Sequence, residues 1–266
     1  MAKRADPRYL RDVAYADPSG LGARASLYDH QQPHIDIVAE AVDALASIDG
    51  RVVGDVGCGN GRYIGALRAA GARVIGVDLS SGMLAGVPVP RPDLIVADAQ
   101  SLPLADACLD ALLMMHMLYH VPDPQRAVEE VTRVLRRGGR VLVATNGSRH
   151  LGEMNALWLP LLDRAGIKGD LQDVGLVNPR LTVGTAQQLI EMHLRDVEER
   201  WLRSSVVVDR AGPVIRHAES TTGAQVVGEQ RDELLGELAE SVEAQIQRDG
   251  EFRITTEVVF LTATNP

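Results

Sequence analysis

The chain has 266 residues, of which 45% are hydrophobic and 24% charged, so it is long enough to bury a full core and has the composition of a soluble globular protein. Its net charge of -9 argues against a general nucleic-acid binder, which needs a basic face. Cys58 and Cys108 are its two cysteines and lie in different segments, which excludes a disulfide framework and predicts a reduced, cytoplasmic protein without a metal site.

Two further segments bear on targeting. Residues 1–7 have no apolar stretch behind their charges, so they do not resemble a secretory signal. The most apolar run, residues 111–121, is too short and too interrupted by histidines to span a bilayer. We therefore expect no membrane partner.

Helical and strand patterns alternate along the first 145 residues. Helical spacing of apolar residues recurs over residues 35–45, 63–70 and 124–135. Short, continuously apolar runs occupy residues 51–56, 73–78, 93–98, 109–115 and 140–145. Runs of that kind are typical of parallel strands that are covered on both faces. The alternation predicts an α/β fold with a doubly wound sheet.

The pattern changes after residue 147. Two amphipathic stretches, residues 153–162 and 185–194, precede a strand at 197–209, a long charged helix at 230–247 and a strand at 252–264. This ending predicts a Rossmann-like sheet of seven strands, mostly parallel, whose C-terminal strand is antiparallel. Residues 209–228 are expected to form a loop.

A glycine-rich turn, residues 55–61, follows the first predicted strand. Such a turn brings backbone N–H groups and the positive end of a helix dipole to one point, and glycine lets a ligand approach the main chain. A dinucleotide fingerprint would place its third glycine where Arg62 stands, whereas the third glycine here is Gly61. Asp55, two positions before Gly57, suits a ligand with an ammonium group rather than a pyrophosphate.

Acidic residues also end the next two strands. Asp78 follows the second strand, where a carboxylate can accept two hydrogen bonds from a ribose diol. Asp98 and Ala99 follow the third strand, where a carboxylate and a backbone N–H can bind an adenine edge. The three carboxylates together describe a ligand with an amine, a ribose and an adenine, and without phosphates.

Several of these segments resemble one family. Residues 53–61 look like motif I of class I S-adenosylmethionine-dependent methyltransferases, and residues 76–80 look like the acidic loop after its second strand. Residues 97–103, 117–122 and 133–140 resemble later motifs of the same family. Arg137 and Leu109 depart from it, since a proline and an aromatic residue are usual at those positions. The match is ordered over roughly residues 50–147 and is closest to the branch that methylates small molecules.

The resemblance implies S-adenosyl-L-methionine as the cofactor and a role for each matching residue. Asp55, Gly57, Cys58 and Gly59 would hold its methionine end, Asp78 its ribose, and Asp98 and Ala99 its adenine, with Leu79, Met83 and Met115 beside it. It also implies one domain, residues 1–266, made of a helical cap (1–50), a cofactor-binding core (51–147), a substrate-lid insertion (148–196) and C-terminal strands with a helix (197–266).

Candidates for the chemistry lie beside the cofactor motifs. Methyl transfer is a direct displacement, so a general base is needed only if the acceptor is protonated. His116 and His120, at the end of the fourth strand, are the catalytic candidates, with packing against the adjacent loop as the alternative. The candidate substrate contacts, each of which is otherwise a core or loop residue, are Tyr15, Tyr28, His150 and Met154.

We therefore expect methyl transfer to an oxygen or nitrogen of a small molecule in specialised metabolism, by a cytoplasmic protein that is compatible with a homodimer and has no nucleic-acid partner. Three alternatives stay open. An RNA methyltransferase would need a basic surface. An NAD-dependent oxidoreductase is disfavoured by the glycine spacing. A non-catalytic S-adenosylmethionine-binding protein would share the turn.

Overall fold

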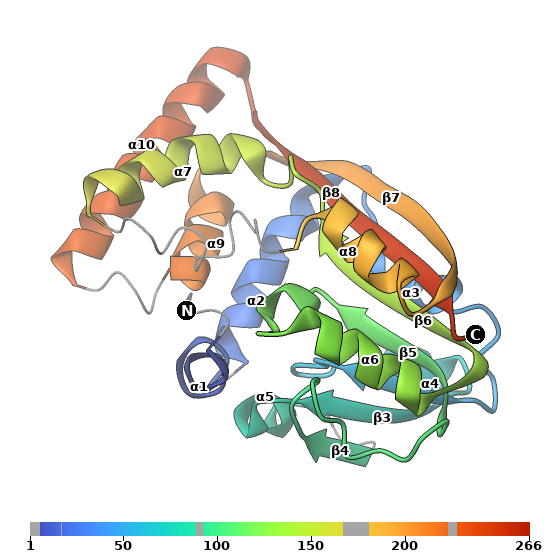
Figure 1. The fold of residues 1–266 in the computed structure, drawn as a ribbon. Helices are drawn as coiled ribbons and strands as arrows, with labels where there is room; N and C mark the ends of the chain where they lie inside the picture. The colour runs from blue at the N-terminus through green and yellow to red at the C-terminus, as the bar shows by residue number, and fades with distance from the viewer. Residues whose placement is uncertain (1–5, 17, 89–92, 167–180, 223–227) are drawn as a thin grey trace.

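The computed structural model describes residues 6–16, 18–88, 93–166, 181–222 and 228–266. Eight strands form one sheet in the order β1-β7-β8-β6-β5-β2-β3-β4 (Figure 1). The predicted α/β class with a doubly wound sheet is confirmed. The predicted strand count of seven is wrong, because Gln31–Gln32 (β1) pairs with the edge of β7 over two residues.

The parallel part of the sheet contains five strands, each close to a predicted apolar run. These are β2 (Val52–Val56), β3 (Arg73–Asp78), β4 (Asp93–Val96), β5 (Leu109–Met115) and β6 (Leu135–Asn146). Helix α3 (Ile37–Ala44) precedes them, and the α-helices between them are α4 (Ile64–Ala69), α5 (Ser81–Ala85) and α6 (Pro124–Val134). The five parallel strands all end at the same edge of the sheet. This edge therefore brings the predicted glycine turn and the predicted acidic residues together.

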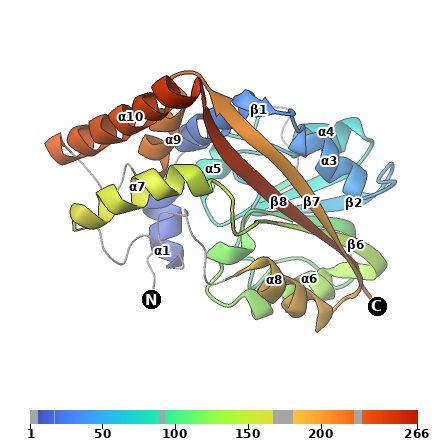
Figure 2. The same cartoon turned by 90° about the horizontal axis from the view of Figure 1, so that it is seen from above.

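The other edge of the sheet is antiparallel. β8 (Phe252–Thr264) runs antiparallel to both β6 and β7 (Arg195–Val208), so the predicted antiparallel C-terminal strand is confirmed. Both strands are much longer than a typical strand and extend past the parallel part of the sheet (Figure 2).

A helical layer packs on the extension of β7 and β8. It consists of α7 (Gly152–Arg164), α9 (Gly212–Thr222) and α10 (Glu229–Asp249), and α2 (Ser19–Ser26) contacts α9 (Figure 1). Trp158, Val214, Leu238 and Phe252 are fully buried in its core. The expectation of a loop over residues 209–228 is wrong, because α9 lies there with its apolar face buried in this core.

The predicted insertion at residues 148–196 does not act as one unit. Its first helix, α7, belongs to the helical layer, whereas α8 (Val183–Glu191) contacts α6 and β7 on the sheet (Figures 1 and 2). Buried Ala186, Leu189 and Ile190 fix α8 against the main core. This part of the chain therefore stabilises two separate regions.

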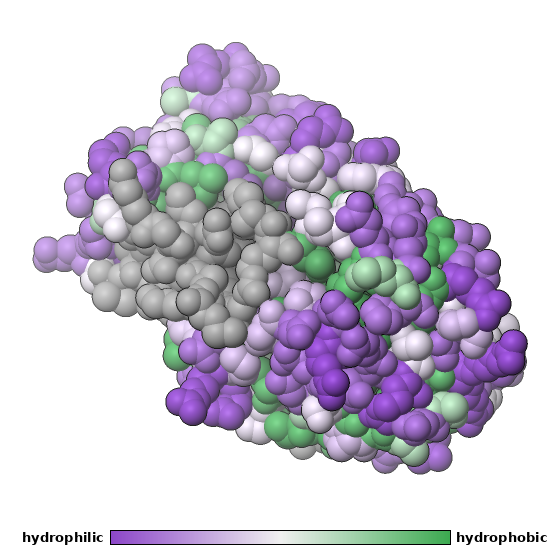
Figure 3. All heavy atoms as spheres, viewed as in Figure 1, coloured by the Kyte–Doolittle hydropathy of each residue, from purple (hydrophilic) through white to green (hydrophobic). Residues whose placement is uncertain are grey.

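The N-terminal segment is short and helical, and it crosses the edge where the parallel strands end. It contains α1 (Pro7–Tyr9), the π-helical turn η2 (Leu10–Ala14), α2 and the 3-10 turn η3 (Leu27–His30). Hydrophilic residues cover most of the described surface in the view of Figure 3. Within the described residues, every helix is too short or too polar to cross a membrane.

Candidate functional site

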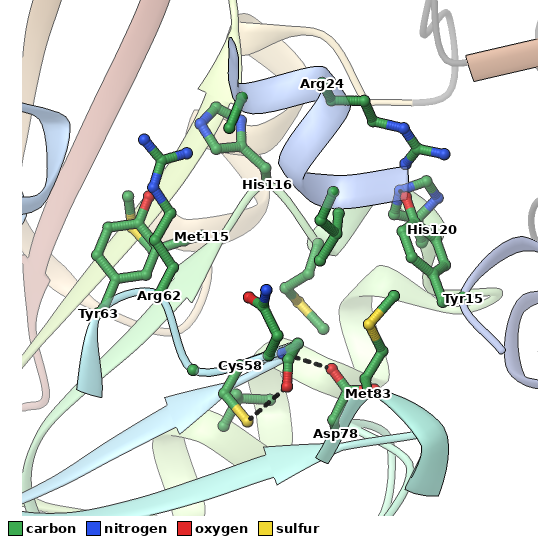
Figure 4. A pocket seen from close by; sticks show the side chains of 18 of the residues that line it. Tyr15, Arg24, Cys58, Arg62, Tyr63, Asp78, Met83, Met115, His116 and His120 are labelled. Carbon is green, nitrogen blue, oxygen red and sulfur yellow. Dashed lines mark hydrogen bonds between the residues drawn. The ribbon is translucent and has the colours of Figure 1, made fainter. Parts of the chain in front are cut away.

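A cavity of about 1300 Å³ opens where the parallel strands end. Its floor is formed by the turn after β2 and by the ends of β3 and β5, and its walls by the N-terminal segment, the turn after β6 and α9. Figure 4 shows part of its lining, with Cys58, Asp78 and Met83 labelled beside the turn and Met115 and His116 beyond them. We call the part around Gly59, Asp78 and Asp98 the nucleotide half, and the part around Tyr28, His150 and His217 the distal half.

The glycine turn forms the floor of the nucleotide half. Gly57 and Cys58 donate their backbone N–H groups to Val77 at 2.7 and 3.0 Å, which ties the turn to β3. Gly57 and Gly59 have φ of 76° and 55°, a left-handed conformation that favours glycine. A Cβ on Gly57 would lie 2.8 Å from Met117, so this glycine is also required by packing.

Asp78 lies next to the turn and lines the cavity, as predicted. Its carboxylate accepts backbone N–H groups from Gly59 and Ser80, both at 2.8 Å. The contact with Gly59 is drawn in Figure 4. Burial raises the pKa of this carboxyl, and the backbone donors partly oppose that effect. Each oxygen keeps a lone pair for a further donor, so the group fits a diol.

Asp55 lies beneath the turn and is fully buried. Among the described residues, neither of its carboxylate oxygens has a hydrogen-bond partner. Burial, helped by the charge of Asp78, raises its pKa to about 7. Asp55 does not line the cavity, so direct contact with an ammonium group, as predicted from the sequence, has no support from its position. Its charge acts on the turn from below.

The residues predicted to hold the adenine lie together on the cavity wall, and their adenine role stays a prediction. Asp98, Ala99, Leu79 and Met83 all line the nucleotide half. Gln100, which the sequence analysis missed, donates its backbone N–H and its side-chain amide to Asp98 at 2.9 Å. The amide therefore orients the carboxylate. Gln100 follows Asp98 by two residues, a spacing typical of such local bonds.

His116 and Met115 lie at the junction of the two halves, at the end of β5 (Figure 4). The backbone N–H of His116 still pairs with Ala144 at 3.1 Å, but its φ is 53°. This left-handed conformation turns the chain out of the strand, and it is strained for a residue other than glycine. Burial lowers the pKa of His116 to about 4, assisted by the nearby Arg62 guanidinium, so the imidazole is neutral at pH 7.

His120 has a different environment. Its Nε2 lies 3.1 Å from the Tyr15 hydroxyl, and Arg24 lies over the Tyr15 ring at 5.5 Å. The Tyr15 carbonyl also accepts the Ser80 hydroxyl at 2.7 Å. These contacts hold the N-terminal segment against the nucleotide half, so that this segment closes one side of the cavity. Both residues line the cavity, and their predicted catalytic and substrate roles stay predictions.

The distal half combines residues from distant segments. Tyr28 comes from η3, His150 from the turn after β6 and His217 from α9, and all three line the cavity. The Tyr28 hydroxyl lies 3.0 Å from His150 Nε2, and the Tyr28 ring packs edge-on to His217. His217 and Arg62 were missed by the sequence analysis. Only Arg62 had a signal, because it directly follows the glycine turn.

Met154 is not part of the cavity wall. Its side chain is fully buried in the helical layer, among the residues packed on α7. The prediction of a substrate contact at Met154 therefore has no support, because the helical spacing of α7 directs it into the core. Among the described residues, no group of three or more histidine, cysteine or carboxylate side chains is placed to hold a metal ion.

The sheet order, the glycine turn and the acidic strand ends define a Rossmann-like nucleoside-binding domain. Residues 54–143 match the methyltransferase domain family. The chain therefore carries a class I S-adenosylmethionine-dependent methyltransferase domain. The residues present fit that cofactor, since Asp78 presents a partly buried carboxylate to the cavity beside a glycine turn that lines it.

Curated relatives include a demethylmenaquinone methyltransferase of Renibacterium salmoninarum, which is 31% identical over 156 residues, or 53% of this chain and 66% of that protein. A ubiquinone biosynthesis O-methyltransferase of Paracidovorax citrulli is 36% identical over 112 residues, or 39% of this chain and 47% of that protein. The matched segments thus span about half to just under two thirds of these relatives.

Among solved structures, the 4+2 cyclase SpnF shares the fold with a TM-score of 0.55 and 22% identity, over 88% of this chain and 82% of that chain. That protein is described as a cyclase. Similarity of fold at this level therefore does not by itself define the reaction.

Proposed function

We propose that the protein transfers a methyl group from S-adenosyl-L-methionine to a small molecule bound in the distal half of the cavity. The observation that carries the proposal is the continuity of one cavity from Asp78 and the glycine turn, past Met115, to His116. The nucleotide half would hold the cofactor, with Asp78 on the ribose and Asp98 on the adenine. When bound, the cofactor supplies an electrophilic methyl group on a sulfonium.

The distal half supports an uncharged or weakly acidic acceptor of modest size. Apolar side chains in its wall, such as Ile35, Leu202 and Val258, accompany the few polar ones. The relatives named above act in quinone pathways, and one of them is an O-methyltransferase. We infer an oxygen or nitrogen acceptor on a partly apolar molecule, and a place in specialised metabolism. A cytoplasmic location and a homodimer remain part of this proposal.

His116 is the residue best placed to remove a proton from the acceptor. Because it is neutral at pH 7 and, among the described residues, its ring has no hydrogen-bond partner, its free nitrogen can accept a proton from a hydroxyl or an ammonium group. The left-handed backbone at this position keeps the ring directed away from the sheet.

A second function, cofactor binding without methyl transfer, would use the same glycine turn and the same Asp78 carboxylate. Calorimetry with S-adenosylhomocysteine and a methyl-release assay over a panel of phenols, quinols and amines separate the two. Binding together with turnover supports methyl transfer. Binding without turnover of any acceptor supports the second function, and absence of binding contradicts both.

The role of His116 is tested once an acceptor is found. We expect His116→Ala to lower kcat by about 10² to 10⁴ with unchanged affinity for S-adenosylhomocysteine, which are the effects of losing a general base. The rate of the intact enzyme should be flat from pH 8 to pH 5 and fall near pH 4, where His116 becomes protonated. An unchanged kcat in the variant would show that the acceptor loses its proton elsewhere.

A further inference from the structure

Tyr28 and His150 form a partly buried pair in the distal half of the cavity. The Tyr28 hydroxyl lies 3.0 Å from His150 Nε2, and the two rings are nearly parallel, with an interplanar angle of 21°. The residues are 122 positions apart, so the pair is formed by the fold and not by a local motif. The direction of its hydrogen bond determines what Tyr28 can offer to a ligand.

The backbone fixes that direction. The N–H of Glu257, in β8, donates to His150 Nδ1 at 3.1 Å, so Nδ1 cannot carry a proton. A neutral imidazole then carries its proton on Nε2. His150 Nε2–H is therefore the donor and the Tyr28 oxygen is the acceptor. The hydroxyl proton of Tyr28 is left over, and among the described residues it has no acceptor.

The turn that carries His150 is held firmly. The Glu257 carboxylate accepts the Arg149 guanidinium at 2.6 Å and the Arg149 backbone N–H at 3.2 Å. The next residue, Leu151, donates its N–H to Thr255 at 2.8 Å and has a left-handed φ of 56°. These contacts hold the backbone of the turn, and a rotation that exchanged the two ring nitrogens would break the ring's own hydrogen bonds with the Glu257 N–H and with Tyr28.

The surroundings keep both groups uncharged. Burial raises the pKa of Tyr28 to about 12 and lowers the pKa of His150 to about 3. Burial also lowers the pKa of His217, which packs on Tyr28, to about 4. One neutral hydroxyl would compensate a full negative charge poorly for the loss of its water, and the Arg62 guanidinium, whose charge reaches Tyr28, opposes the effect of burial on Tyr28 only in part. An uncharged oxygen is a better partner.

We propose that the Tyr28 hydroxyl is the donor that selects a methyl acceptor carrying an uncharged oxygen, such as a carbonyl, and that His150 is its positioning residue. The inference rests on the proposed function, because it places the acceptor in the distal half. It adds a requirement for a second oxygen on the acceptor, besides the atom that is methylated.

Acetophenone, ethylbenzene and benzoate test this requirement as probes of similar size that differ in the oxygen. We expect ligand-observed NMR, with S-adenosylhomocysteine present, to show acetophenone binding about three- to tenfold more tightly than ethylbenzene, the value of one hydrogen bond. Tyr28→Phe should remove this preference. Tyr15→Phe, which removes the hydroxyl that lies 3.1 Å from His120 Nε2, should leave it intact.

Three outcomes would overturn the inference. The intact protein could bind acetophenone and ethylbenzene equally well, or bind neither. The preference for acetophenone could survive in Tyr28→Phe, or benzoate could bind more tightly than acetophenone. Failure of S-adenosylhomocysteine to bind in calorimetry would instead contradict the proposed function, and the probes can still be compared without it.

Histidine ¹⁵N NMR tests the positioning role of His150 without any acceptor. We expect a neutral ring with its proton on Nε2 from pH 8 down to pH 5, and an altered Nε2 shift in Tyr28→Phe. A proton on Nδ1, or a titration near the ordinary histidine pKa, would contradict the assignment. The altered shift would show that the His150 ring is bonded to the Tyr28 oxygen.

Discussion

The two halves of the cavity are built in opposite ways. The nucleotide half takes its residues from one stretch, between the turn after β2 and the end of β4, in which each group follows a strand. The distal half joins Tyr28, His150 and His217, whose contacts connect positions more than a hundred residues apart. The nucleotide half is thus built from local segments, whereas the distal half, where we propose that the acceptor binds, depends on how the helical layer packs on the sheet.

Burial also acts on the halves with opposite signs. In the nucleotide half it raises the pKa of the carboxyl groups of Asp55 and Asp78. At the junction of the halves and in the distal half it lowers the pKa of His116, His150 and His217. In both cases the charged form is disfavoured. A positively charged ligand would be stabilised beside the carboxyl groups and not beside the neutral histidines. We therefore expect a mutation in one half of the cavity to leave the other half unchanged.

Asp78→Ala should give the largest effect and should break only the nucleotide half. The change removes a buried carboxylate and leaves the N–H groups of Gly59 and Ser80 without their acceptor. We expect the affinity for S-adenosylhomocysteine, measured by calorimetry, to fall about 100-fold or more, roughly the value of a charge-assisted pair of hydrogen bonds.

Asp78→Asn serves as the matched control, because it keeps one oxygen and the shape of the side chain. It should lose less affinity than the alanine variant. The distal half should stay intact, which the Nε2–H signal of His150 reports. Unchanged affinity in Asp78→Ala would contradict the ribose role and, with it, the division of the cavity into halves.

Asp55→Asn should affect stability and affinity in opposite directions. Asp55 has a pKa of about 7 in the folded protein and an ordinary value of 3.8 in the unfolded chain. The folded state therefore binds more protons between pH 4 and pH 7, and its free energy of unfolding falls as the pH rises through that range. An asparagine does not ionise, so the variant does not lose this part of its free energy of unfolding. At pH 8 it should therefore be more stable than the intact protein by ~3 kcal/mol.

Urea unfolding at pH 5 and pH 8 measures this difference, which should be smaller at pH 5, since Asp55 is then mostly protonated. Affinity for S-adenosylhomocysteine should fall only about tenfold, as expected for a charge that acts through the turn without touching the ligand. A loss of affinity as large as that in Asp78→Ala would instead support the predicted direct contact between Asp55 and the ammonium group of the ligand.

The predictability of the two halves follows from their construction. Asp55, Asp78 and Asp98 could be found because strand periodicity placed each of them at the same sheet edge. The sequence could not show that Asp55 lies below the turn rather than in the cavity, because that depends on the direction of one side chain.

The distal half was only partly predictable for a physical reason. Tyr28 and His150 were selected individually, but nothing in the sequence links them, since the N–H of Glu257 and the turn at Arg149 create the pairing. His217 lies on α9, a short helix whose few apolar residues did not distinguish it from a loop in the sequence. Tertiary packing decided both the helix and its place beside Tyr28.

His116 joins the two halves, and its backbone gives the smallest predicted effect. Because its φ of 53° suits glycine, we expect His116→Gly to be more stable than His116→Ala by about 1 kcal/mol in urea unfolding. The same pair of substitutions at Gln188, an exposed position within α8, is the control, and there the alanine variant should be the more stable by about 1 kcal/mol. If alanine is also preferred at position 116, the strand end relaxes when the imidazole is removed. The left-handed turn would then be imposed by the ring in its pocket, and not by the frame that the ends of β5 and β6 provide.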